Sequence, residues 1–157
     1  MAAHLTETGL LMPASQSASS DANKLDDYEE GTWTPANAHI GITINSTSQY
    51  IKIGKLCSIW CDVTWADSPA DSSQSGGYLT GIPFNRETVS GSEFCMPHEW
   101  WGNATSGGSN AAASYEIRIH SGDNTININN RAAGYIATRS NMASSRLHIS
   151  GAYDATD

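Results

Sequence analysis

The clearest pattern in the chain is a series of short segments in which apolar and polar residues alternate, as in strands with one buried face. Residues 56–65 are the strongest example. The apolar face of this segment consists of Cys57, Ile59, Cys61, Val63 and Trp65. The opposite face is polar except for Leu56 and Trp60, which predicts that this second face is partly covered as well.

Similar patterns predict strands at residues 40–44, 49–53, 78–82, 114–120, 125–129, 134–138 and 146–153. Turns are predicted at residues 45–48, 54–55 and 121–124, which are rich in Asn, Ser and Gly. The residues expected to point inward are Ile40, Ile42, Ile44, Tyr115, Ile117, Ile119, Ile126, Ile128, Leu147 and Ile149. No segment has a convincing helical pattern. Short strands with polar turns predict an all-β, antiparallel β-sandwich of jelly-roll type.

The first 30 residues differ in character from the rest and are expected to form an extended N-terminal arm. Ser, Ala and Asn dominate residues 14–23, and an acidic box follows at residues 26–30. The arm is therefore residues 1–30, and the β-sandwich is residues 31–157. If the arm docks on a partner, the residues expected to contact that partner are Leu5, Leu10, Leu11, Met12, Asp26, Asp27, Glu29 and Glu30.

The charge distribution argues against several classes of function. The net charge is −8, and residues 1–30 hold six acids against Lys24 alone, which leaves ten acids and seven bases for the body. No basic stripe exists to neutralise phosphates, so nucleic-acid binding is not expected. The acidic box either contacts a basic surface or is a solvated linker. No run of about 18 apolar residues predicts membrane insertion, and no secretory signal pattern opens the chain, so folding in the cytosol is expected.

The three cysteines do not form a metal-ligand pattern. Cys57 and Cys61 share a strand face, at a separation of roughly 13 Å for a rise of about 3.3 Å per residue, which is too far for a disulfide. Together with Cys95 they are expected to be reduced and mostly buried.

No catalytic motif is present, so neither enzymatic activity nor a cofactor is expected. His120 and His148 both fall on outward strand faces. They could meet near a threefold axis and bind a metal or an anion, although such residues are more often solvated. The acidic box has no spacing that would position the six or more oxygen ligands of Ca²⁺.

The best candidate for a binding site lies in residues 96–103. Adjacent tryptophans cannot both face the core of a strand, so either Trp100 or Trp101 is expected at a surface. Aromatic faces stack on sugar rings, and Glu99 and Asn103 could hydrogen-bond hydroxyl groups. The alternative is packing in a trimer interface, where aromatic residues are enriched.

Three motifs resemble segments of bacteriophage tail-fibre and related virion proteins. The first is residues 13–35, PASQSASSDANKLDDYEEGTWTP, which joins a polar tether and the acidic box to a first strand. The segment YIKIGK at residues 50–55 is similar to the family's Y-x-K-I-G, and TGIPF at residues 80–84 to its I-T-G-L-P-F. The resemblance covers residues 12–84 and is one of general character beyond them.

The resemblance implies a homotrimer on a phage particle, made in the bacterial cytoplasm, with a receptor-binding role toward bacterial surface glycans. About two dozen residues precede the junction, whereas related fibres place long shafts there. The arm would then attach directly to another virion protein of the tail or baseplate. The same geometry fits a capsid cement protein, a small trimeric sandwich whose arms grip the major capsid protein.

Overall fold

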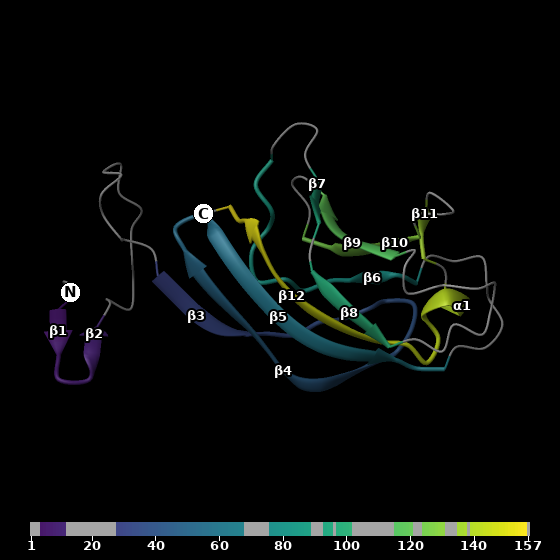
Figure 1. Ribbon diagram of the computed structural model, residues 1–157, viewed down its shortest axis with the longest axis horizontal. Helices are drawn as coiled ribbons and strands as arrows, with labels where there is room; N and C mark the ends of the chain where they lie inside the picture. The colour runs from purple at the N-terminus through teal and green to yellow at the C-terminus, as the bar shows by residue number, and fades with distance from the viewer. Residues whose placement is uncertain are drawn as a thin grey trace.

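The computed structural model shows a protein built almost entirely from antiparallel strands (Figure 1). The residues that it describes are 4–11, 28–67, 76–88, 93–95, 97–101, 115–120, 124–130, 135–137 and 139–156. Within them the only helix is α1, Arg139–Met142, which is four residues long. The prediction of an all-β fold with antiparallel sheets is confirmed.

Twelve strands are present in the described residues. Their bounds are β1 His4–Thr6, β2 Gly9–Leu11, β3 Tyr28–Trp33, β4 Ile42–Ile53, β5 Leu56–Trp65, β6 Tyr78–Leu79, β7 Glu93–Cys95, β8 His98–Trp101, β9 Tyr115–His120, β10 Ile126–Asn130, β11 Tyr135–Ile136 and β12 Arg146–Asp154. The first sheet has the order β3-β4-β5-β12-β8. The second has the order β11-β10-β9-β7, with β6 also on β10, and β1 and β2 form a separate hairpin.

Strand β5 is the centre of the first sheet and follows the predicted alternation. All five residues expected on its apolar face are buried, and Cys57, Cys61 and Val63 are fully so. Neighbouring β12 presents Leu147, Ile149 and Tyr153 to the same core. Antiparallel pairing puts these side chains beside those of β5, because residues directly opposite each other point to the same face.

The second sheet covers that core from the other side. The predicted hairpin of β9 and β10 is confirmed, with Ile119 opposite Ile126 and Ile117 opposite Ile128, all fully buried. The buried side chains of both sheets join in one hydrophobic cluster. Figure 1 shows β9, β10 and β6 lying across the broad ribbons of β5 and β12.

The predicted turn at residues 45–48 is wrong. Strand β4 runs without a break from Ile42 to Ile53, and its pairing with β5 shifts register twice between Ile44 and Gln49. Extra residues in one strand of a ladder are accommodated as β-bulges, which bend the strand without ending it. Ile44, expected to be inward, is 41% exposed although it pairs with the fully buried Val63.

The predicted reversal at residues 54–55 is confirmed. Ile53 pairs with Leu56, so Gly54 and Lys55 form a two-residue hairpin loop. Gly54 has a φ of 55°, a value that glycine adopts without a steric penalty. This loop fixes the register of β4 against β5 at that end of the sheet.

The first strand starts inside the segment that was assigned to the arm. Tyr28 pairs with Ile53, and Glu29 pairs with Lys52, so β3 extends β4 from Tyr28 onward. The boundary at residue 30 is therefore displaced, and Glu29 and Glu30 belong to the sheet. The high charge of residues 26–30 is typical of a linker and therefore gives no sign in the sequence that a strand begins at Tyr28.

The aromatic segment at residues 93–101 divides between the two sheets. Strand β7 pairs with β9 in the second sheet, whereas β8 pairs with β12 in the first. The chain therefore passes from one sheet to the other just before β8. Pro97 lies at this crossing, and its carbonyl accepts a hydrogen bond from the Ser150 amide at 3.4 Å.

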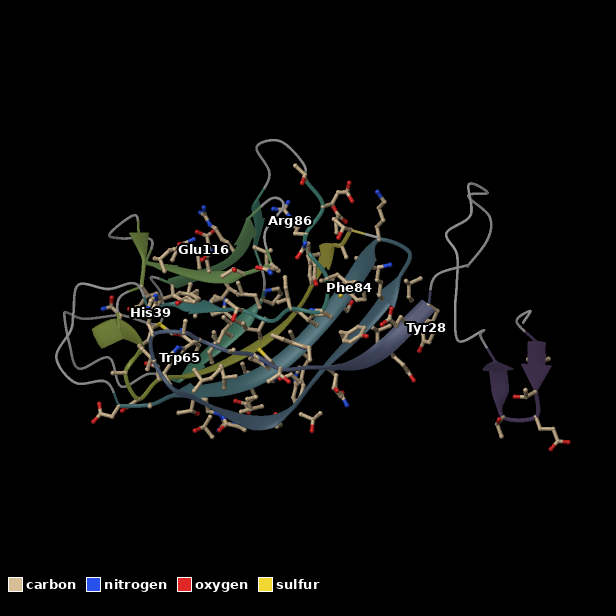
Figure 2. All side chains as sticks on the ribbon, turned by 180° about the vertical axis from the view of Figure 1, so that it is seen from behind. Tyr28, His39, Trp65, Phe84, Arg86 and Glu116 are labelled. Carbon is tan, nitrogen blue, oxygen red and sulfur yellow. The ribbon has the colours of Figure 1, made fainter. Side chains whose placement is uncertain are left out.

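Residues 85–87 form a second connection between the sheets. Their backbone lies beside the end of β12, where the Glu87 amide donates to the Asp154 carbonyl at 2.8 Å. Arg86, labelled in Figure 2, is only 2% exposed, and its Nη1 donates to the carbonyl of Ile119 in β9 at 2.8 Å. The buried guanidinium of Arg86 thus connects residues 85–87, which lie beside β12 of the first sheet, to β9 of the second sheet.

Replacement of this guanidinium is expected to be costly. Arg86→Ala should lower the free energy of unfolding by about 2–4 kcal/mol, because it removes a buried donor and leaves a void. Urea unfolding followed by tryptophan fluorescence measures the change. Lys55→Ala is the matched control: Lys55 is 58% exposed in its pair with Glu87, and such pairs contribute below about 1 kcal/mol. Equal costs for the two variants would contradict the connecting role of Arg86.

Candidate functional site

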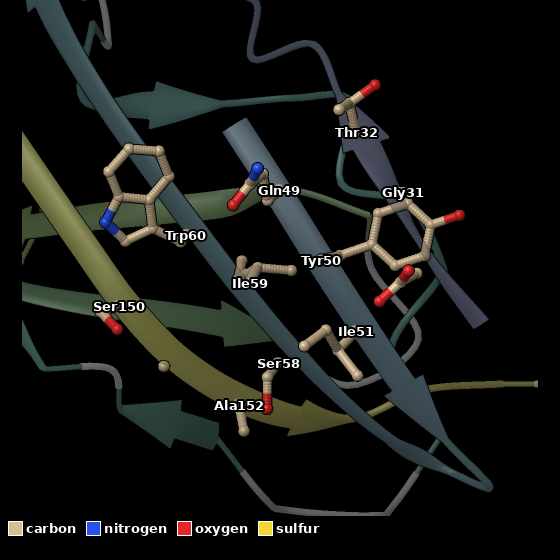
Figure 3. A pocket seen from close by; sticks show the side chains of 12 residues that line it. Gly31, Thr32, Gln49, Tyr50, Ile51, Ser58, Ile59, Trp60, Ser150 and Ala152 are labelled. Carbon is tan, nitrogen blue, oxygen red and sulfur yellow. The ribbon is translucent and has the colours of Figure 1, made fainter. Parts of the chain in front are cut away.

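A groove of about 750 Å³ crosses the outer face of the first sheet, which is the face turned away from the core (Figure 3). Two neighbouring rows of outward residues line it, one residue from each of the strands β3, β4, β5 and β12. The first row is Glu30, Ile51, Ser58 and Ala152, and the second is Thr32, Gln49, Trp60 and Ser150. We call this feature the cross-strand groove.

The floor of the cross-strand groove is backbone. Between the two rows lies a third set of paired residues whose side chains point toward the core. These residues are Gly31, Tyr50, Ile59 and Gly151. The two rows stand two residues apart along each strand, roughly 7 Å at the usual rise. Four strands side by side give the groove a length of about 14 Å between the outer strand axes.

The walls combine apolar surface with neutral polar groups. Trp60 and Ile51 supply the large apolar side chains, and Ile51 is 44% exposed. Thr32, Ser58, Ser150 and Gln49 supply hydroxyl and carboxamide groups that both donate and accept hydrogen bonds. Of the lining residues in the described part of the chain, Glu30 alone is charged.

Two contacts hold side chains of the walls in place. Tyr28 lies outside the groove on β3, and its hydroxyl donates to Oε2 of Glu30 at 2.8 Å. This hydrogen bond is the main cause of a raised pKa of Tyr28. At the other end, the ring of Trp60 contacts the His148 ring edge to face, with centroids 5.5 Å apart. Both contacts reduce the freedom of groups that face the groove.

Gly31 is required by the ring that lies behind the groove floor. A Cβ at this position would lie 2.8 Å from Cε1 of Tyr50, closer than real Cβ contacts occur. The hydroxyl of Tyr50 donates to Oε1 of Glu29, which with burial raises the pKa of Tyr50 to about 12. Its ring also packs edge to face on Phe84, with centroids 5.5 Å apart. The close packing of Tyr50 on Gly31 therefore holds β3 against β4 beneath the groove.

A polar cluster lies beyond the Trp60 end of the groove on the same face. The Asp62 carboxylate accepts hydrogen bonds from Nε and Nη2 of Arg146, the first at 2.9 Å. It also accepts one from Nδ2 of Asn45 at 2.8 Å. The Arg146 hydrogen bonds are the largest cause of a lowered pKa of Asp62, and partial burial opposes them. This bidentate pair joins β12 to β5 on the outer face.

The predicted aromatic site lies on strand β8, at the opposite edge of the sheet from β3. Trp101 pairs with Arg146 and Glu99 with His148, whereas Trp100 pairs with the buried Leu147. The two tryptophans thus occupy alternate register positions, as adjacent strand residues must. Asn103 lies outside the described residues. Glycan binding by these four residues stays a prediction.

The residues predicted to dock on a partner are distributed over three places. Leu5, Leu10 and Leu11 belong to the β1–β2 hairpin, where Leu5 pairs with Leu10 and is 82% exposed. Glu29 and Glu30 lie in β3. Met12, Asp26 and Asp27 fall outside the described residues. Glu30 also lines the cross-strand groove.

The histidines and cysteines form no metal centre in the described part of the chain. His120 is in β9 and His148 in β12, so these two histidines belong to different sheets of the chain. No group of three or more His, Cys, Asp or Glu residues there could hold a metal ion. Cys57 and Cys61 are free and buried, as predicted, and burial raises the pKa of Cys61 to about 12. Among the same residues, no helix has the length and apolar character needed to cross a membrane.

No protein-family model, curated protein sequence or solved structure matches the chain.

Most of the groove residues carried no signal in the sequence. Trp60 was the exception, because a large aromatic residue on the polar face of residues 56–65 is anomalous there. Gln49, Ser58 and Ser150 are ordinary outward residues of their strands. They become a site only when the register brings them beside Trp60 and Ile51.

The contact between Gly31 and Tyr50 is open to a double-variant test. Gly31→Ala is expected to lower the free energy of unfolding by about 1–3 kcal/mol, because the new methyl group overpacks the Tyr50 ring. In a Tyr50→Leu background the same change should cost clearly less, since the blocking ring is gone. Gly41→Ala is the control, because its Cβ would meet only Ala66 at 3.7 Å. Equal costs in both backgrounds would contradict this role of Gly31.

Acidic pH is expected to lower the free energy of unfolding because it protonates the carboxylate of Asp62. Its folded pKa is lowered by Arg146, whereas the unfolded value lies near about 3.9. The stabilisation is therefore complete above the unfolded pKa and is lost as pH falls through the lower, folded pKa. Urea unfolding at about pH 7 and about pH 3 should show a smaller acid-induced loss for Asp62→Asn and Arg146→Ala than for the wild type. An unchanged loss in both variants would show that this pair is not the source.

Proposed function

We propose that this chain is a non-enzymatic structural protein of a bacteriophage particle. Its proposed place is a short, homotrimeric tail-fibre or receptor-binding tip docked through its N-terminal arm. The observation that carries the proposal is the start of β3 at Tyr28, inside the motif that resembles the fibre junction. The first sheet begins there, and residues 28–33 pair with the YIKIGK segment of the second resembling motif.

Two features of the described residues support assembly on this scaffold. The exposed aliphatic residues Ile53 and Leu56 lie opposite each other at the β4–β5 hairpin end of the outer face, outside the groove, and are 45% and 51% exposed. Closed symmetry would cover such a patch in a homotrimer. The antiparallel two-layer arrangement suits the jelly-roll topology proposed for the domain.

A capsid cement protein is the second candidate. The observation that favours it is the β1–β2 hairpin in the arm, whose Leu5 is 82% exposed. An arm that ends in an apolar hairpin could grip a neighbouring subunit of the phage head. Both candidates require a virion protein as the partner of the arm, the major capsid protein in one case and a tail or baseplate protein in the other.

The two candidates differ in where the protein lies on the particle. Purified particles labelled with a gold-tagged antibody to this chain are expected to carry label at the tail end. The purified protein should have a solution mass of about three times 16.7 kDa. Label spread over the head would establish the cement function instead. Absence from particles altogether would contradict both candidates.

A further inference from the structure

We infer that the cross-strand groove binds a neutral, polyhydroxylated chain, which is a saccharide without charged groups. The inference deepens the receptor-binding function proposed above, and it rests on that function for the biological source of the saccharide. It places the site on β3, β4, β5 and β12 rather than on the tryptophans of β8. The observation that carries it is that the ring of Trp60 and the seven other side chains of the two rows stand around a floor of backbone.

The direction of the groove argues against an extended peptide. A peptide that adds to a sheet aligns with a free strand edge and uses its unpaired main-chain groups. This groove instead runs across the ladder. Its floor residues Tyr50 and Ile59 belong to strands that are paired on both sides. An occupant must therefore be recognised by the side chains of the two rows.

The charge of the walls argues against anionic ligands. Among the described residues that line the groove, Glu30 is the only carboxylate, and none is Lys, Arg or His. A phosphate, sulfate or carboxylate ligand would meet a carboxylate without a compensating cation. The net charge of −8 adds to the unfavourable field.

The polar groups of the walls argue against a purely apolar ligand. Burying the hydroxyl and carboxamide groups of Ser58, Ser150 and Gln49 without partners would cost free energy for each one. A saccharide satisfies them, because its hydroxyl groups donate and accept hydrogen bonds in the same way as theirs. Glu30 adds a charged acceptor for a sugar hydroxyl.

The apolar components of the walls fit the other surface of a sugar. Trp60 lies in the second row, and His148 supports its ring from outside the groove. The C–H faces of a pyranose ring are apolar and pack on an aromatic ring. Ile51 lies in the first row, diagonally across the floor, and offers a second apolar contact. The groove thus offers apolar surface for the C–H faces of a sugar ring and hydrogen-bonding groups for its hydroxyls.

The test is a binding screen on purified protein with an array of neutral bacterial oligosaccharides, and with anionic oligosaccharides and Ser/Thr-rich peptides on the same slide. The best neutral oligosaccharide is then titrated by calorimetry. Trp60→Ala should lower its affinity at least about tenfold. Ser58→Leu should abolish binding by filling the groove, and it removes no packing contact because Ser58 is exposed. Asp154→Ala, on the next outward row and outside the groove, is the matched control and should bind as the wild type does.

Retained binding in both Trp60→Ala and Ser58→Leu would overturn the assignment of the groove. Binding of only anionic oligosaccharides, only peptides or nothing at all would overturn the ligand class. These outcomes are distinct from failure of the virion function. If the protein is absent from particles and yet binds a neutral oligosaccharide through the groove, the proposed function fails and the groove assignment stands.

Discussion

The pairing of β5 with β4 on one side and with β12 on the other is the constraint on which the rest of the structure depends. Side chains alternate along a strand, so one register sends Cys57, Cys61 and Val63 into the core and Ser58 and Trp60 outward. A shift by one residue would exchange the two faces. The register of β5 against β4 and β12 therefore determines both the core and the groove.

Binding surface and stability remain separate on this sheet because they use opposite faces. The inward face meets the second sheet, and Arg86 adds a buried hydrogen bond between the layers. Tyr50 links the two faces, since its ring lies over Gly31 on the inner side while the backbone at that point forms the groove floor. The outward residues of the rows can vary without changing the core, which suits a surface that recognises a variable ligand.

The sequence predicted which face of a strand is buried better than it predicted which strands pair with each other. Alternation alone identified the buried side of β5, and it identified the inward isoleucines of β9 and β10. It could not show that β4 continues through residues 45–48, because Asn, Ser and Thr suit both a turn and an exposed, bulged strand. It also could not assemble the groove, which needs the register of three separate strand pairs. Trp60 marked the correct face, but its neighbours come from segments far apart in the chain.

The acidic character of β3 has a consequence for solubility. Strand β3 is an edge of the first sheet, with one side free of a neighbouring strand in the described part of the chain. A free edge can recruit an identical edge and start aggregation. Glu29 and Glu30 lie on that edge, and the same residues on an approaching copy would repel them. Glu29 and Glu30 are therefore expected to oppose edge-to-edge joining of copies of the chain at high local concentration.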